Sequence, residues 1–186
     1  MSQLYVGCSG FYYREWKGYF YPETLPTKDW FEYYTQHFNT VEINASFYRL
    51  PRLSMLRRWH ETSPVDFRFT IKVPRTITHF SKFQNTAEEL KSFYELAQAG
   101  LGEKLGPVLF QLPPSLQFSS KLLAIITAQL DKSFMNVIEF RHKSWWCTEV
   151  YEKLHQANVT FCSISFPGLP EEVINTSTTL YVRFHG

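Results

Sequence analysis

Short apolar segments recur along this 186-residue chain, and most of them end in polar residues that can do chemistry. Helix-like segments separate them. This alternation is typical of a parallel sheet of βα units, in which polar residues at the carboxyl ends of the strands meet on one face. The sequence therefore predicts an α/β fold, a TIM-like β/α barrel. The predicted strands are 4–9, 40–46, 67–73, 108–112, 136–140, 160–164 and 179–184.

The predicted helices are recognised by their periodicity and their ends. The first begins near residue 28 and carries aromatic residues at helical spacing. In the helix predicted over 86–99, Thr86 with Glu89 three residues later forms a capping-box pattern, and Gly100 follows its end. The other helices are predicted over 53–61, 119–130 and 148–156.

Side-chain alternation predicts which face of each strand is polar. Successive side chains of a strand point to opposite faces, and in a closed barrel one face is the interior. In the second predicted strand, Val41 and Ile43 share one face and Glu42 lies on the other. The third and seventh strands repeat this pattern, so we expect their polar faces to point inward. The expected inward set is Glu42, Asn44, Lys72, Gln111, Glu139, Arg141, Ser163, Arg183 and His185.

Length and composition indicate one globular domain covering residues 1–186. The chain is long enough for one hydrophobic core, and its net charge of +2 does not indicate a general polyanion-binding role. Three widely spaced cysteines, Cys8, Cys147 and Cys162, suit free thiols in a reducing cytoplasm. We see no signal peptide and no apolar run long enough to span a membrane, so we expect a cytoplasmic protein without a membrane partner.

The sequence resembles the YecE-like proteins, the family catalogued as domain of unknown function 72. The resemblance covers the whole chain and rests on many motifs in the same order. These are VGCSGF at 6–11, WKG at 16–18, FYP at 20–22, TVEIN at 40–44, FYRLP at 47–51, KVPR at 72–75, ITH at 77–79, LGPVLFQLPP at 105–114, EFRHKSW at 139–145 and YVRFHG at 181–186.

The resemblance implies a TIM-like barrel from a mainly microbial family and no particular reaction. Relatives often place an Asp after the sixth strand, where this chain has Ser163 or Ser165. Relatives also continue beyond the His-Gly motif, and a full barrel takes about 250 residues. We therefore expect a barrel truncated after its seventh strand, with the family's C-terminal part missing. Its open sheet edges would permit self-association.

Two carboxylates and one histidine are the candidate catalytic residues. Glu42 and Glu139 can form a general acid/base pair of the kind used in glycoside hydrolysis, and His185 can carry a proton. The candidate binding residues are polar side chains at or near strand ends. They are Ser9, Asn44, Tyr48, Lys72, Arg75, Gln111, Arg141, His142 and Arg183.

The charges of the inward set favour an anionic ligand. Two carboxylates, Glu42 and Glu139, face three fixed cations, Lys72, Arg141 and Arg183. Arginine offers a planar fork that matches phosphate or carboxylate. A divalent metal bound by the carboxylates and histidines of the set is an alternative, although the same cations would repel it. No metal site and no cofactor are predicted.

Several functions remain open from the sequence. One is a cytoplasmic enzyme, a hydrolase or isomerase, that acts on an anionic small molecule or a phosphodiester by acid/base chemistry; a metal-dependent form is a variant of it. Another is a non-catalytic module that binds an anion, a sugar phosphate or nucleic acid. A third is a structural remnant without activity of its own. The charged ring also has a purely structural explanation, an internal salt-bridge network.

Overall fold

The structure, a computed structural model, describes residues 3–185. The chain divides into two compact units. Unit 1 contains the residues up to Lys72 together with Tyr94–Gly106, and unit 2 contains Val73–Phe93 and the residues from Pro107 onward. Each unit is described below by itself. That residues 1–186 act as one domain stays a prediction.

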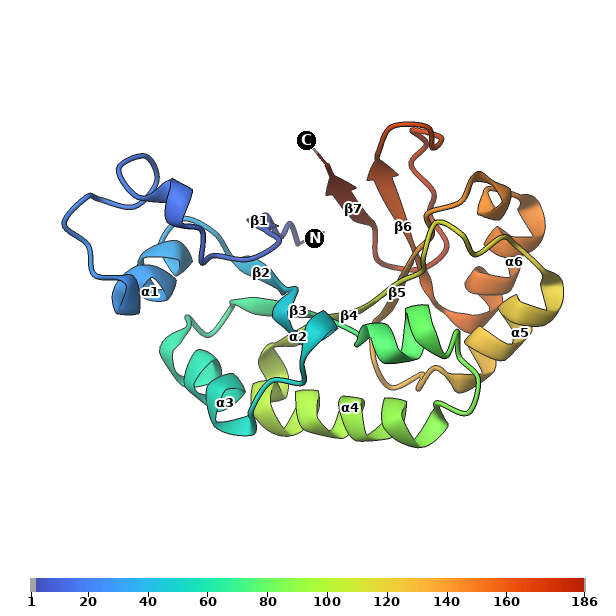
Figure 1. Cartoon of the computed structure of the whole chain (residues 1–186), viewed down its shortest axis with the longest axis horizontal. Helices are drawn as coiled ribbons and strands as arrows, with labels where there is room; N and C mark the ends of the chain where they lie inside the picture. The colour runs from blue at the N-terminus through green and yellow to red at the C-terminus, as the bar shows by residue number, and fades with distance from the viewer. Residues whose placement is uncertain (1–2, 186) are drawn as a thin grey trace. The chain divides into compact units, whose positions relative to one another are not determined.

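Unit 1 contains three parallel strands in sequence order (Figure 1). They are β1 (Gly7–Cys8), β2 (Thr40–Ile43) and β3 (Arg68–Lys72). Its helices are η1 (Arg14–Trp16), η2 (Thr27–Asp29), α1 (Trp30–Thr35), α2 (Ala45–Tyr48), α3 (Leu53–Thr62) and η4 (Gly102–Lys104). Helix α4 (Ala87–Leu101) begins in unit 2 and ends in unit 1.

Unit 2 contains four parallel strands, again in sequence order. They are β4 (Leu105–Gln111, which enters the unit at Pro107), β5 (Asn136–Glu139), β6 (Thr160–Ser165) and β7 (Tyr181–Phe184). Its helices are the π-helix η3 (Thr76–Phe80), α5 (Ser120–Gln129), the short η5 (Lys143–Trp145) and α6 (Thr148–Ala157). Figure 1 shows α5 and α6 side by side next to β5 and β6.

The core of unit 1 is largely aromatic. The long loop after β1 folds back onto α1, where the Tyr21 ring stacks on the Trp30 ring with centroids 4.4 Å apart. The Tyr34 hydroxyl joins β1 to β2, because it accepts from the Cys8 amide at 2.7 Å and donates to the Thr40 carbonyl at 2.9 Å. The buried rings therefore stabilise the unit by removing apolar surface from water, at roughly 1.5–3 kcal/mol per large side chain.

The two faces of β2 and β3 follow the predicted alternation. The register pairs Glu42 with Thr70 on one face and Val41 with Phe69 on the other. Val41 and Phe69 are both buried. The predicted separation of polar and apolar faces is therefore confirmed in unit 1.

In unit 2 the predicted faces are confirmed for β4, β5 and β7 and are wrong for β6. The register pairs Gln111 with Glu139 and Ile164 with Arg183. Cys162 and Ile164 join the buried cluster that includes Leu109 and Val137, so they share the face of Glu139. Ser163 therefore points to the opposite face, where its hydroxyl accepts from the Ile174 amide at 2.9 Å.

The capping box predicted at the start of α4 is also wrong. The Thr86 hydroxyl donates to Oε1 of Gln129 at 2.9 Å, and the Glu89 carboxylate accepts a hydrogen bond from the Thr76 hydroxyl. Both side chains therefore bind residues outside the helix. These contacts tie α4 to neighbouring elements of unit 2 rather than to its own first turn.

The strands and helices together form the α/β architecture of a TIM-like β/α barrel with seven parallel strands. Residues 3–185 contain no eighth strand. On β7, the side chains of Val182 and Phe184 are 38% and 85% exposed, although both are apolar. Within the described residues, no helix combines the length and the apolar character needed to span a membrane.

Candidate functional site

A buried carboxylate at the end of β5 is the centre of the candidate site. Glu139 is the last residue of β5 and is fully buried. Its neighbour across the register is Gln111, the last residue of β4, which donates from Nε2 to Oε1 of Glu139 at 3.0 Å. Parallel strands place these side chains at their carboxyl ends, where β/α-barrel proteins build their sites.

Two arginines bind this carboxylate, one on each oxygen. Arg141, two residues beyond β5, donates from Nε to Oε1, and Arg183 of β7 donates from Nη1 to Oε2. The arginine side chains are 13% and 10% exposed, so both guanidinium groups are largely removed from solvent. Glu139 therefore fixes the position of both cations.

His185, directly after β7, contacts both guanidinium groups through one ring nitrogen. Its Nε2 lies 3.1 Å from Nη2 of Arg141 and 3.3 Å from Nη1 of Arg183. The same Nε2 also lies 3.7 Å from Oε1 of Glu139, and whether it donates or accepts depends on the tautomer of the ring. The His185 side chain is 23% exposed.

Phe166 covers one side of the cluster. Its ring centroid lies 4.4 Å from the Arg141 guanidinium carbon, a cation–π contact. The same ring meets the His185 ring edge-on, with centroids 5.5 Å apart. Sequence reasoning missed Phe166. The available signal was its place as the first residue after β6, where an aromatic side chain reaches the same end of the sheet.

The electrostatics of the cluster keep Glu139 ionised. Burial alone would raise the pKa of Glu139, but its hydrogen bond with His185, the charges of Arg183 and Arg141 and the hydrogen bond from Gln111 together lower that pKa to about 2. Glu139 is therefore ionised at neutral pH. The cluster thus combines two guanidinium groups with one ionised carboxylate.

The remaining predicted residues of unit 2 lie outside this cluster of contacts. His142 caps η5, because its Nδ1 accepts from the Ser144 amide at 3.2 Å and contacts the Ser144 hydroxyl at 2.8 Å. Arg75 is exposed and its guanidinium lies 5.3 Å from the ring centroid of Phe80. The structure thus brings together Gln111, Glu139, Arg141, Arg183 and His185.

The other five predicted site residues, Ser9, Glu42, Asn44, Tyr48 and Lys72, belong to unit 1. Glu42 and Lys72 are buried at the ends of β2 and β3, and the Lys72 amine lies 4.3 Å from the Phe47 ring centroid. Asn44 donates from Nδ2 to the Ser9 carbonyl at 3.0 Å, while its buried Oδ1 has no hydrogen-bond partner among residues 3–185. Tyr48 is largely exposed.

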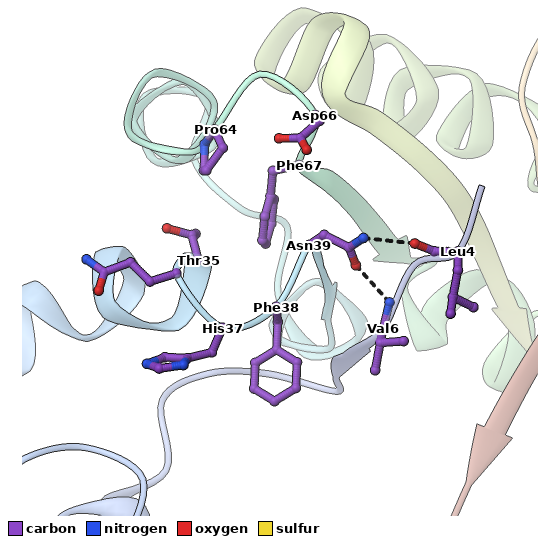
Figure 2. Close-up of a pocket in the computed structure, with 10 residues that line it drawn as sticks. Leu4, Val6, Thr35, His37, Phe38, Asn39, Pro64, Asp66 and Phe67 are labelled. Carbon is purple, nitrogen blue, oxygen red and sulfur yellow. Dashed lines mark hydrogen bonds between the residues drawn. The ribbon is translucent and has the colours of Figure 1, made fainter.

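A hollow of about 430 Å³ in unit 1 lies at the opposite ends of the strands. Figure 2 shows Asn39 in this hollow, where it accepts from the Val6 amide and donates to the Leu4 carbonyl, both at 2.8 Å. Asn39 precedes β2, so the hollow is at the amino ends of the strands. Active sites of β/α barrels lie at the carboxyl ends, and we therefore do not assign the function to this hollow.

The described residues do not fit a metal site. Both oxygens of Glu139 accept from arginines. Across residues 3–185, no three His, Cys, Asp or Glu side chains lie close enough together to bind a metal ion.

The fold and the polar cluster at the strand ends define an α/β protein of the TIM-like barrel class. The family described as "Protein of unknown function DUF72" matches residues 5–186, and the chain belongs to this family. A DUF72 family protein from Thermotoga maritima MSB8 has a crystal structure similar to this chain, with a TM-score of 0.87 and 32% identity. That match covers 98% of this chain and 74% of the other.

Two curated relatives are similar over shorter stretches. The UPF0759 protein YecE of Escherichia coli K12 is 31% identical over 136 residues, which cover 69% of this chain and 49% of YecE. The UPF0759 protein YunF of Bacillus subtilis is 26% identical over 161 residues, 81% of this chain and 55% of YunF. The chain thus spans about half the length of the curated relatives it matches.

Proposed function

We propose that the ends of β4, β5 and β7 form a binding site for an oxyanion, a carboxylate or a phosphate group. The observation that carries this proposal is the pair of arginines held by one buried carboxylate at the carboxyl ends of the strands. A pair of guanidinium groups fixed before the ligand arrives loses little freedom on binding, which favours affinity.

The geometry supports different roles for two of the three candidate catalytic residues, Glu139 and His185. With a pKa of about 2, Glu139 is a weak base at neutral pH, so its role is to position Arg141 and Arg183. His185 is the candidate proton carrier, because its imidazole lies against both guanidinium groups and is partly exposed. The assignment of Glu42 as a base stays a prediction.

The proposed reaction class is acid/base chemistry on an anionic small molecule or a phosphodiester, catalysed in the cytoplasm. In it, Arg141 and Arg183 hold the anion and stabilise charge that develops in the transition state. His185 accepts a proton from the substrate or returns one to it. A non-catalytic oxyanion-binding module would use the same arginines without turnover.

Direct binding measurements test the proposal. Inorganic phosphate and acetate are titrated into the wild type and into Arg141→Leu, with Arg57→Leu as the control that removes an exposed arginine of α3. Loss of a charge-assisted hydrogen bond should weaken binding by Arg141→Leu roughly 10- to 150-fold. The control should bind like the wild type. Equal binding by all three proteins, or by none, would contradict the proposal.

A further inference from the structure

Four exposed arginines lie on a short stretch of unit 1, between the end of α2 and the middle of α3 (Figure 1). Residues 43–60 contain these four arginines and no acidic residue, whereas the net charge of the whole chain is only +2. Positive charge is therefore concentrated on this stretch and is not a property of the whole surface. We call the four residues the arginine patch; they are Arg49, Arg52, Arg57 and Arg58.

The charges of the arginine patch are not compensated within the described part of the chain. No hydrogen bond or ion pair joins any of the four guanidinium groups to another group of residues 3–185. Arg57 and Glu61 stand at the i,i+4 spacing of helical ion pairs, yet these two described residues form none. Helix α3 also has no acidic residue in its first turn, so the positive end of its dipole adds to the charge of the patch.

The backbone spreads the four arginines over a limited length. Arg49 follows α2 in an extended conformation, and Arg52 is the residue before the first turn of α3. On α3, Arg58 points away from the fully buried Leu56, because residues two apart on a helix face nearly opposite directions. At about 3.5 Å per extended residue and 1.5 Å per helical residue, the patch spans at most about 20 Å. A linear polyanion can therefore contact several of its arginines at once.

The residue types of the patch favour a chain of phosphates that carries aromatic bases. All four charges are guanidinium groups, whose planar fork matches a phosphate. Tyr48, the last residue of α2 and the neighbour of Arg49, is 70% exposed, so a base can reach its ring. A positive surface combined with an exposed aromatic ring is how proteins bind single-stranded nucleic acid without sequence preference.

The packing of α3 argues against a membrane surface as the partner. A helix that lies in a membrane interface inserts an apolar face between the lipids. In α3 the apolar side is occupied by the fold, because Leu56 is fully buried. The helix therefore offers its charged side to a partner.

We infer that the arginine patch binds the phosphate backbone of single-stranded nucleic acid and that Tyr48 stacks on a base. This inference concerns unit 1 and does not depend on the oxyanion site at Glu139. One exposed arginine, screened by salt, holds a single phosphate weakly, and affinity arises when several phosphates are contacted together. Arg57→Leu therefore remains a valid control for the binding of inorganic phosphate at the oxyanion site.

The first test measures how salt affects the binding of a fluorescein-labelled oligo(dT) of about 20 nucleotides to the wild type, by fluorescence anisotropy. If the four arginines each neutralise one phosphate, the slope of log K against log salt should be about −2.8. Raising the salt from 50 to 200 mM should then weaken binding roughly 50-fold. Absence of binding at 50 mM salt, or a slope near zero, would overturn the inference. This measurement requires no variant.

Two variants with the same net charge show whether the patch itself is responsible. The patch variant changes all four arginines to Gln, and its binding of oligo(dT) at 50 mM salt should be weaker by more than about 100-fold. The control variant should bind within about threefold of the wild type, because its changes lie outside the patch. Equal losses in the two variants would overturn the inference, since they would show an effect of net charge alone. The control changes four exposed lysines to Gln, namely Lys28, Lys91, Lys121 and Lys132.

Substitutions of Tyr48 test the stacking contact. Tyr48→Ala should weaken the binding of oligo(dT) roughly 5- to 150-fold, and Tyr48→Phe, which keeps the ring, should bind like the wild type. A duplex of the same length should bind more weakly than oligo(dT), because its bases already stack on one another. Unchanged binding by Tyr48→Ala, or tighter binding of the duplex, would overturn the assignment to single strands.

Other polyanions and the oxyanion site provide the remaining comparisons. Tighter binding of phosphatidylserine vesicles or of polyglutamate than of oligo(dT) would overturn the inference in favour of a membrane or an acidic protein. The patch variant should bind acetate like the wild type, whereas Arg141→Leu should lose acetate binding and keep oligo(dT) binding. Loss of oligo(dT) binding by Arg141→Leu alone would overturn the assignment to unit 1 and leave the oxyanion site standing.

Discussion

The two units carry the same sequence signal, polar residues at strand ends, and use it differently. In unit 2, Arg141 and Arg183 both bind the buried Glu139 carboxylate. In unit 1, Asn44 binds the Ser9 backbone, and the Lys72 amine lies against the Phe47 ring. The difference teaches that polar residues at strand ends can take different kinds of partner: a carboxylate for Arg141 and Arg183, and a backbone carbonyl or an aromatic ring for Asn44 and Lys72.

The largest expected effect comes from removing the carboxylate that holds the arginines. Glu139→Gln removes the carboxylate that binds two largely buried guanidinium groups, which should lower the free energy of unfolding by roughly 3–5 kcal/mol. Urea denaturation measures the change. The comparison variant in unit 1 is Asn44→Ala, which removes one neutral hydrogen bond to the Ser9 carbonyl and should lower the free energy of unfolding by less. A Glu139→Gln protein as stable as the wild type would contradict the account of unit 2.

The faces of the sheet were predictable from the sequence because alternation is a local property of a strand. Glu42 and Glu139 lie on the faces that alternation assigned to them. Ser163 was placed wrongly, because the face of β6 depends on the register that pairs Thr160 with Val137, which the sequence of β6 alone does not contain.

The contacts of the candidate site were less predictable, because they join residues far apart in the sequence. Alternation placed Glu139, Arg141 and Arg183 in the inward set, but it did not predict which carboxylate oxygen each arginine binds. Phe166 was missed, since its role depends on contacts with Arg141 and His185 in other βα units. Likewise, Thr86 binds Gln129, 43 residues away, in preference to the local capping box.

Lowering the pH should reduce the stability of unit 2, because it protonates Glu139. Its pKa in the folded protein is about 2, below the ordinary value of 4.5, so its stabilising contribution is present above pH 4.5 and is lost as the pH falls toward 2. The difference between these two pKa values corresponds to about 3 kcal/mol in the free energy of unfolding. Urea denaturation of the wild type between pH 5 and pH 2 measures this loss. Glu139→Gln should show a flatter dependence on pH, and parallel curves for the two proteins would contradict the assignment.

Removing a polar contact in unit 1 should have a smaller effect on the free energy of unfolding and should leave ligand binding unchanged. Tyr34→Phe removes the hydroxyl that joins the Cys8 amide to the Thr40 carbonyl in a buried aromatic core. We expect a loss of roughly 1–3 kcal/mol in the free energy of unfolding. Oxyanion affinity should match the wild type. A change in affinity equal to that of Arg141→Leu would show that the two units do not differ as described.

The smallest effect on stability is expected at the exposed end of β7. Phe184 is 85% exposed, so Phe184→Lys should change the free energy of unfolding by no more than about 0.5 kcal/mol. A lysine on an edge strand opposes pairing with another chain. Sedimentation analysis should therefore show less self-association for this variant than for the wild type. If self-association is unchanged in the variant, the edge of β7 does not cause it.

The most direct test of the oxyanion site is a crystal structure of the protein grown with acetate at a saturating concentration. The account predicts that the acetate carboxylate accepts a hydrogen bond from Arg141 or Arg183 at about 2.7–2.9 Å, with Glu139 still bound to both arginines. Acetate bound only elsewhere on the protein, with no oxygen in contact with either arginine, would contradict it.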